Sequence, residues 1–331
     1  MKVGVIGAGS WGTALSKLCA DAGHAVSLWA YEKEVAEQIR AGCNETYLPG
    51  VELPPLDASN NLAEVVSGRE LLISVMPSHV VREVWSGVRD ADLGDPIVVS
   101  ATKGIENVTL ATMVEVLRES LPVRLHDRLA ALSGPSFAVE VGNRLPTAVV
   151  VASPSADTAR TVQKALSTDR FRIYTSDDVV GVEVGGAAKN VIAIAAGVAE
   201  GLRFGHNTRA ALITRGLAEI TRLAVAKAGN PMTLAGLAGM GDLVLTCTGG
   251  PSRNRSVGLR LGQGESLEAI QASMKAVAEG VRSAKSCLAL GRRLGVEMPI
   301  TATVHGILYE GLDAREATAA LMKRQLKHEL E

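Results

Sequence analysis

Hydrophobic residues in the first half of the chain follow two alternating spacings. Short apolar runs, typical of buried parallel strands, are separated by segments whose apolar residues recur every three or four positions, as in helices. Between the first two runs, Ala14, Leu15 and Leu18 recur at helical spacing, and Gly23 follows as a stop signal. This alternation predicts a doubly wound, mainly parallel sheet of the Rossmann type. The predicted strands are Val3–Ile6, Ala25–Trp29, Leu71–Val75, Ile97–Ser100, Leu129–Leu132 and Thr147–Val151.

The strand pattern disappears after about Ser176, and helical spacing continues to the end of the chain. Long helices are predicted at Val182–Gly201, Thr208–Ala228 and Leu267–Leu294, with shorter ones from Thr301. A chain of 331 residues is long enough for two domains of ordinary size. We therefore expect a dinucleotide-binding Rossmann domain at 1–178 and an all-helical substrate-binding and catalytic domain at 179–331.

One predicted helix has the apolar composition of a membrane span. The stretch from 182 to 202 is, however, interrupted by Glu183, Lys189, Asn190 and Glu200, which favours a buried helix of a soluble protein. The first strand begins by Val3, which leaves no room for a signal segment. We expect a cytoplasmic protein without a membrane span.

Composition narrows the possible partners. The 34 Lys and Arg residues nearly balance the 35 Asp and Glu residues, so no overall charge attracts nucleic acid, and any bound anion must be held locally. The four cysteines show neither C-x-x-C pairing nor metal-ligand spacing. This pattern fits a reducing compartment and predicts no metal.

The strongest motif is Gly7-Ala-Gly9-Ser-Trp-Gly12, which lies between the first strand and the first helix. In a G-x-G-x-x-G turn, Gly7 permits the tight turn, Gly9 lets a pyrophosphate approach the backbone, and Gly12 lets helix and strand pack closely. The helix N-terminus then offers free N–H groups to the phosphates. The motif predicts a dinucleotide site; FAD and a glycine-rich turn without a ligand are the alternatives.

An acidic residue follows the second strand. Glu32 lies about 20 residues after Gly12, where a carboxylate would bind the ribose hydroxyls. An exposed glutamate at the start of a helix is the other interpretation.

Three later strands each end in a loop of small or polar residues. Because ligands of open parallel sheets bind outside the carboxyl ends of strands, these loops should converge on one crevice. There Lys103 could reach an anionic or carbonyl oxygen, and Gly134 and Ser136 could supply an amide and a hydroxyl; ordinary surface turns are the alternative. The loops are 76–79, 102–104 and 133–138.

Lys189 lies in a helix of small apolar residues that begins where the predicted nucleotide domain ends. An ammonium group so placed would be partly desolvated, and desolvation lowers a lysine pKa towards the range useful for proton transfer. A lysine that extends out of an amphipathic helix is the alternative.

A second candidate site follows Gly239-Met-Gly-Asp242. There Ser252, Arg253 and Asn254 stand together on a Gly- and Pro-rich turn that enters a helix. A guanidinium fork with a hydroxyl, an amide and backbone N–H groups suits a small phosphate. A solvated basic turn is the other interpretation.

Together these segments resemble bacterial glycerol-3-phosphate dehydrogenases over essentially the whole chain. Besides the glycine motif, the resemblance rests on residues 76–79, 101–104, 133–138, 185–190, 207–216, 239–248, 252–255 and 296–300. It implies hydride transfer between NAD(P)H and dihydroxyacetone phosphate, which yields sn-glycerol 3-phosphate for phospholipid synthesis.

The resemblance also implies individual roles. Lys189 would be the catalytic proton donor and acceptor. The implied cofactor contacts beyond Gly7, Gly9 and Gly12 are Ser10, Trp11, Tyr31, Lys103, Ala138, Arg253, Val277 and Glu279. The implied substrate contacts are Lys103, Gly134, Ser136, Lys189, Asp242, Ser252, Arg253 and Asn254.

One position departs from the family pattern. Residue 31 is often Arg or His, which would favour a 2′-phosphate, whereas this chain has Tyr31 followed by Glu32. NAD and NADP therefore both stay open as the cofactor, and a homodimer stays open as the assembly. The competing functions are a β-hydroxyacid or 6-phosphogluconate type dehydrogenase and a non-catalytic dinucleotide sensor.

Overall fold

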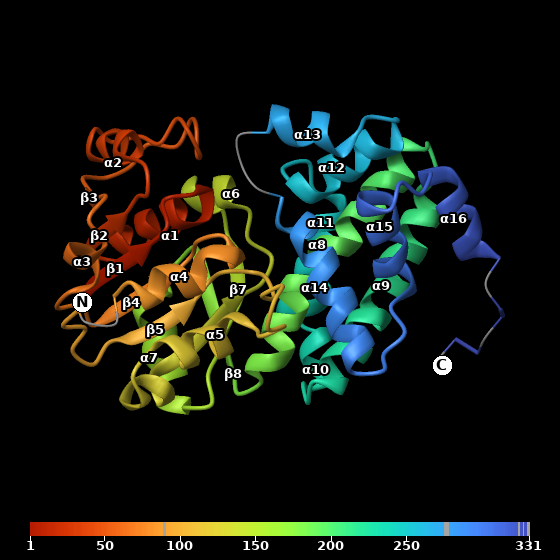
Figure 1. Ribbon diagram of the computed structural model, residues 1–331. Helices are drawn as coiled ribbons and strands as arrows, with labels where there is room; N and C mark the ends of the chain where they lie inside the picture. The colour runs from red at the N-terminus through yellow and green to blue at the C-terminus, as the bar shows by residue number, and fades with distance from the viewer. Residues whose placement is uncertain (89–90, 275–277, 324, 327, 330–331) are drawn as a thin grey trace.

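The computed structural model describes the chain except for residues 89–90, 275–277, 324, 327 and 330–331. A sheet with its covering helices occupies one side of the molecule, and helices α8 to α16 occupy the other (Figure 1). This arrangement confirms the predicted fold class, a mainly parallel doubly wound sheet followed by a helical region.

The sheet has eight strands in the order β3-β2-β1-β4-β5-β6-β7-β8. All neighbouring pairs are parallel except β6 and β7, which are antiparallel. The strands are β1 Lys2–Ile6, β2 Ala25–Trp29, β3 Asp57–Ser59, β4 Leu71–Ser74, β5 Ile97–Ser100, β6 Leu129–Ser133, β7 Thr147–Ala152 and β8 Phe171–Ser176.

Two of these strands were not expected from the apolar runs. Strand β3 is only three residues long and begins with Asp57, a residue type that is depleted in strands. Strand β8 lies at the sheet edge, and its residues alternate between buried Phe171 and Ile173 and exposed neighbours. Such alternation is the usual pattern of a half-buried strand, so β8 was readable from the sequence.

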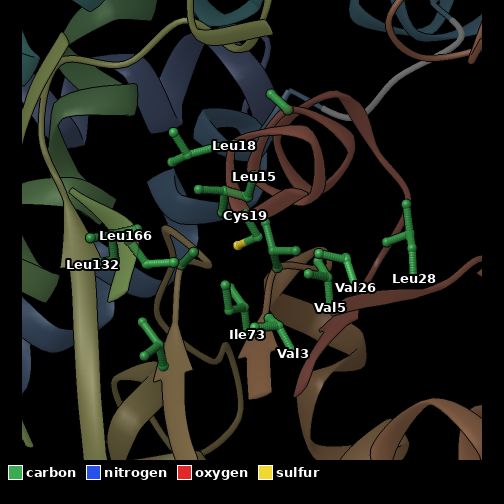
Figure 2. Packing of buried hydrophobic residues seen from close by; sticks show 14 of the residues in the cluster. Val3, Val5, Leu15, Leu18, Cys19, Val26, Leu28, Ile73, Leu132 and Leu166 are labelled. Atoms are coloured by element: carbon green, nitrogen blue, oxygen red, sulfur yellow. The ribbon is translucent and has the colours of Figure 1, made fainter. Parts of the chain in front are cut away.

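Successive strand residues face opposite sides of the sheet, and helices cover both sides. Val3, Val5 and Ile73 pack with α1 residues such as Leu15 and Cys19, as Figure 2 shows. The opposite face has its own apolar cluster. The helices of this half are α1 Ser10–Asp21, α2 Lys33–Arg40, α3 Leu62–Val66, α4 Val81–Ser86, α5 Met113–Ser120, α6 Ala138–Gly142 and α7 Ala156–Leu166, with 3₁₀ turns at Ser78–Val80 and Val123–Arg128.

The second half of the described chain is helical. One prediction was wrong, because the helix expected over Leu267–Leu294 is two helices. Met274 and Ala278 have extended backbone angles, which a continuous helix does not allow. The helices are α8 Val179–Gly201, α9 His206–Ala226, α10 Pro231–Leu234, a π-helical turn η3 Leu237–Gly241, α11 Asp242–Thr248, α12 Arg253–Gly262, α13 Leu267–Ser273, α14 Glu279–Arg293, α15 Pro299–Tyr309 and α16 Ala314–Met322.

Helix α8 is the central helix of this half. It is long and apolar enough to cross a membrane by length and composition, yet 83% of its most apolar 18-residue window is buried inside the protein. Its apolar side chains belong to the core that the helical region forms. It is therefore the core helix that the sequence predicted.

Glycines set the spacing between α8 and α12. A Cβ at Gly197 would overlap the carbonyl oxygen of Arg255, and a Cβ at Gly258 would overlap that of Ile194. The two backbones can approach this closely only because both helices carry glycine at the contact. This packing brings the N-terminus of α12 to the middle of α8, where Lys189 lies.

A buried carboxylate fixes α15 to α9. Glu219 accepts hydrogen bonds from the backbone N–H groups of Ile300 and Thr301, each at 2.9 Å. These N–H groups belong to the first turn of α15, where no preceding helical carbonyl is available. The segment 296–300, one of those that carry the family resemblance, thus serves the architecture of the helical region.

Candidate active site

The glycine-rich turn after β1 forms a backbone cradle. Gly7 has a φ of +119°, which favours glycine, and a Cβ at Gly12 would overlap the Gly7 carbonyl oxygen. At Gly9, by contrast, an added Cβ would meet no atom within 4 Å. The turn is thus packed on its inner side and open at Gly9, where a pyrophosphate would need to approach.

The groups around this cradle fit an anionic nucleotide. Helix α1 begins after Gly9 with no side chain capping it, so its first-turn N–H groups remain as donors. Among the described residues, the buried indole Nε1 of Trp11 has no hydrogen-bond partner. A dinucleotide would supply acceptors for both, and we conclude that the turn can hold one.

The loops after β4, β5 and β6 converge at the carboxyl edge of the sheet, as their positions predict. The hydroxyl of Thr102 donates to the Met76 carbonyl oxygen at 2.8 Å. The ammonium of Lys103 donates to the Gly134 carbonyl oxygen at 3.0 Å, and the Ser136 hydroxyl donates to the same oxygen at 3.0 Å. These contacts place Lys103, Gly134 and Ser136 side by side at this edge, where the sequence predicts a crevice.

A cluster of two lysines and one aspartate joins this crevice to the helical region. The Asp242 carboxylate accepts from Lys189 at one oxygen and from Lys103 at the other, each at 2.6 Å. We call Lys103, Lys189 and Asp242 the lysine–aspartate cluster. Its members come from the β5 loop, α8 and the start of α11, so it forms only when both halves of the chain are folded together.

Lys189 is the most deeply placed cation of the cluster. Its side chain is 7% exposed, and its ammonium also donates to the Thr246 hydroxyl at 2.7 Å. Burial lowers the pKa of Lys189 to about 8; the Asp242 carboxylate acts against this shift, whereas the charge of Lys103 adds to it. The residue can therefore change its protonation state near neutral pH.

Two residues that contact the predicted site residues, Thr246 and Asn190, were not predicted from the sequence. Thr246 stands one helical turn after Asp242, and its hydroxyl donates to the Asp242 backbone carbonyl at 2.6 Å. The i, i+4 spacing on α11 was the available signal. Asn190 follows Lys189 on α8, and its role depends on a contact with α12 that no local pattern indicates.

A hydrogen-bonded relay connects α8, α12 and α14. The Asn254 amide donates to the Asn190 side-chain oxygen at 2.8 Å and accepts from the Gly280 N–H at 2.9 Å. These two bonds fix the orientation of the Asn254 side chain within the protein. Asn254 can offer a ligand the second N–H of its amide and its backbone N–H in the first turn of α12.

The basic turn, residues 249–255, leads into the N-terminus of α12. Ser252 is buried and caps the helix, its hydroxyl accepting from the Arg255 N–H at 3.2 Å. Arg253 is exposed and donates to the hydroxyl of Ser10 in the glycine-rich turn. This contact brings the predicted phosphate site and the predicted cofactor site next to each other.

A second contact crosses between the two halves at α14. The Glu279 carboxylate accepts from the N–H and the hydroxyl of Ser78, at 3.2 and 2.8 Å. Burial raises the pKa of Glu279 above its ordinary value. Glu279 thus lies against the β4 loop, beside the crevice.

The remaining predicted residues lie at the edges of the site. Ala138 is the first residue of α6, directly after the β6 loop. Tyr31 is 80% exposed, and its ring contacts that of Trp29 edge-on. Val277 lies outside the described residues. Among the described residues, no group of three or more His, Cys, Asp or Glu side chains is placed to hold a metal ion.

The comparisons with known proteins agree with one another. The model of the NAD-dependent glycerol-3-phosphate dehydrogenase N-terminus matches residues 2–159, and that of the C-terminus matches residues 178–319. The glycerol-3-phosphate dehydrogenase (NAD(P)+) of Syntrophobacter fumaroxidans is 55% identical over 331 residues, which cover 99% of this chain and 97% of that protein. That of Anaeromyxobacter dehalogenans is 55% identical over 333 residues, with 100% of both chains covered.

A solved structure extends the similarity to the fold. The crystal structure of glycerol-3-phosphate dehydrogenase from Coxiella burnetii superimposes with a TM-score of 0.92 at 39% identity. The match covers 98% of this chain and 99% of that one. Sequence and structure thus align over nearly their full lengths.

Proposed function

The chain belongs to the NAD-dependent glycerol-3-phosphate dehydrogenase family, and we propose that Lys189 exchanges a proton with its substrate. The protein is an NAD(P)-dependent oxidoreductase that interconverts sn-glycerol 3-phosphate and dihydroxyacetone phosphate. The observation that carries our proposal is the lysine–aspartate cluster, in which the buried Lys189 shares the Asp242 carboxylate with Lys103 from the β5 loop.

The cofactor would lie along that edge. NAD(P)H, when bound, supplies the hydride. The residues that we propose to hold its pyrophosphate are Gly9, Ser10 and Trp11, through the open backbone at Gly9 and the free donors of α1. We assign the region up to residue 178 to cofactor binding and the region from 179 to catalysis.

The proton step falls to Lys189. When C2 of dihydroxyacetone phosphate is reduced, its oxygen becomes an alkoxide that requires a proton. An ammonium group has three N–H donors. Within the described part of the chain, two of those on Lys189 donate to Asp242 and Thr246. The third can serve the alkoxide. With a pKa of about 8, Lys189 can donate the proton in reduction and accept it in oxidation.

Lys103 and Asp242 would prepare this step. Because Asp242 holds one lysine at each carboxylate oxygen, it fixes the separation of the two ammonium groups. The Lys103 side chain is 18% exposed, so its charge remains available to an oxygen in the crevice. We propose that Lys103 stabilises the negative charge that develops on the substrate oxygen.

The basic turn would hold the substrate phosphate. Arg253 offers a guanidinium fork, Ser252 a buried hydroxyl, and Asn254 its backbone N–H at the positive end of α12. Gly134 and Ser136, next to Lys103, would contact the rest of this small molecule. Binding energy from the phosphate then positions the carbonyl for reaction.

We extend the proposal to the cellular setting. The enzyme would act in the cytoplasm, as a homodimer, and supply glycerol 3-phosphate for phospholipid synthesis. The four cysteines are free thiols, which fits a reducing compartment. Light scattering would test the assembly, with a mass of one chain arguing against the dimer.

The decisive experiment follows NADH absorbance after dihydroxyacetone phosphate is added. We expect NADH to be consumed with dihydroxyacetone phosphate and poorly with dihydroxyacetone, which lacks the phosphate. NAD+ reduction with a β-hydroxyacid or 6-phosphogluconate, and none with glycerol 3-phosphate, would assign the other dehydrogenase class. NADH binding without turnover of any of these compounds would indicate a sensor.

A further inference from the structure

A tyrosine and a glutamate meet beside the glycine-rich turn. Glu32 follows β2 and precedes α2, and its half-buried carboxylate accepts from the Tyr47 hydroxyl at 2.8 Å. Glu32 occupies the N-cap position of α2, yet its side chain makes no capping hydrogen bond there. The carboxylate is therefore directed to Tyr47 rather than to its own helix.

Tyr47 is itself fixed to the glycine-rich turn. Its carbonyl oxygen accepts from the Ser10 hydroxyl at 2.6 Å, and its N–H donates to the Asn44 side chain at 3.1 Å. Asn44 is buried, and its amide donates to the Ala8 carbonyl at 3.0 Å and to the Thr13 hydroxyl at 2.8 Å. The tyrosine thus links the Glu32 carboxylate to the backbone that would hold the pyrophosphate.

The position of the Glu32 carboxylate matters for the adenosine ribose, where NAD and NADP differ. In a Rossmann domain, the acid after the second strand hydrogen-bonds the ribose hydroxyls of NAD, whereas the 2′-phosphate of NADP needs a cation there. A free glutamate could rotate away from a phosphate, but a held carboxylate would repel it. The exposed Lys33 and Glu34 carry opposite charges in water, so neither sign prevails next to Glu32.

We propose that Tyr47 is a positioning residue for cofactor choice, holding the Glu32 carboxylate so that the site favours NADH over NADPH. The inference rests on the proposed function, because it takes the glycine-rich turn to be the cofactor site. Tyr47 acts through Glu32 and need not touch the nucleotide.

The test is a titration of both reduced cofactors, followed by nicotinamide fluorescence, on four proteins: wild type, Tyr47→Phe, Glu32→Ala and the double variant. Tyr47→Phe removes one hydroxyl and keeps the ring. We expect it to lower the NADH preference, the ratio of the two dissociation constants, by about three- to tenfold, the size of one hydrogen bond. In the Glu32→Ala background the same change should alter the ratio by less than about twofold.

Tyr174→Phe, on β8, is the matched control. It removes the same hydroxyl group elsewhere in the sheet and should leave the ratio of the two dissociation constants unchanged.

The outcomes separate the explanations. An unchanged ratio in Tyr47→Phe overturns the inference, as does an equal loss of affinity for both cofactors, which would indicate a structural role. An equal shift of the ratio in both backgrounds also overturns it, because Tyr47 would then contact the cofactor itself. Titration does not depend on turnover. If Tyr47→Phe leaves the ratio unchanged while the enzyme still reduces dihydroxyacetone phosphate, the inference about Tyr47 is wrong and the proposed function stands.

Discussion

The glycine-rich turn and the lysine–aspartate cluster contribute to one site in opposite ways. At the turn, the feature that allows binding is open backbone, because a Cβ added at Gly9 would meet no atom within 4 Å. In the cluster, the useful feature is crowding, because three charged side chains meet at 2.6 Å and Lys189 is almost completely buried. The turn would bind the cofactor by leaving space for its pyrophosphate, and the cluster lowers the pKa of Lys189 by excluding water.

This difference determines which substitutions each region tolerates. An added side chain harms the turn, whereas the cluster is harmed by the loss of one charge, which leaves its partners buried and unpaired. Variants of the turn should change cofactor affinity, and variants of the cluster should change the rate of reaction, with the largest effect expected at Lys189.

Lys189→Ala should lower kcat by ~10²–10⁴-fold, the usual range for a lost acid–base group. Its dissociation constant for NADH should remain close to that of the wild type, because the cluster is not part of the glycine-rich turn. Steady-state kinetics and a fluorescence titration measure the two quantities. Lys164→Ala, at an exposed position of α7, is the control. A Lys189→Ala enzyme that keeps more than about a tenth of wild-type kcat would reject Lys189 as the proton donor.

Arg253→Ala should raise KM for dihydroxyacetone phosphate by roughly 10- to 150-fold, since a charge-assisted contact contributes about 1.5–3 kcal/mol. Dihydroxyacetone should be turned over equally poorly by wild type and variant, because it has no phosphate group for Arg253 to bind. Arg260→Ala is the matched control, on the same helix and paired with Glu265. If the Arg253 variant loses activity with both substrates equally, the residue serves the cofactor or the fold.

Gly9→Ala and Gly12→Ala should separate binding from folding within one motif. The methyl group that Gly9→Ala adds would meet no protein atom but would clash with the pyrophosphate. A clash of about 1–3 kcal/mol should weaken NADH binding by roughly 5- to 150-fold. The melting temperature of this variant should not change. Gly12→Ala should melt at a lower temperature, because its Cβ overlaps the Gly7 carbonyl. Normal NADH binding by Gly9→Ala would show that the pyrophosphate lies elsewhere.

The smallest predicted effect concerns cofactor preference. We expect the wild type to use NADH at least as well as NADPH, and Tyr31→Arg to shift kcat/KM towards NADPH by about three- to tenfold, because it adds a cation at the end of β2. Both cofactors must be compared at one salt concentration, since salt screens exposed charges. A wild-type preference for NADPH above about tenfold would mean that a cation other than residue 31, with Lys33 the nearest candidate, reads the 2′-phosphate.

Local patterns made part of this site predictable. The glycine motif lies within six residues, and Lys189 stands out as a charge in an apolar helix, so both were visible in the sequence. The convergence of the three loops followed from the rule that the carboxyl ends of parallel strands share an edge. The assignment of roles to single residues stays a prediction.

What escaped the sequence depends on long-range contacts. Lys103 and Asp242 are 139 residues apart, and Glu32 and Tyr47 stand on opposite sides of helix α2 in the sequence, 15 residues apart. No periodicity reports such pairs. The short strand β3 and the break between α13 and α14 were missed because tertiary packing, rather than local preference, decides them.

The most direct test of the account is the pH dependence of kcat/KM in both directions, because it reports the protonation state of the free enzyme. Reduction of dihydroxyacetone phosphate requires the protonated Lys189, so its rate should fall as the pH rises through about 8. Oxidation of glycerol 3-phosphate requires the neutral lysine, so its rate should rise over the same interval. In Asp242→Asn, loss of the opposing charge should move both transitions to lower pH. Profiles that stay flat between about pH 7 and 9, or that fall together in both directions, would contradict the role of Lys189.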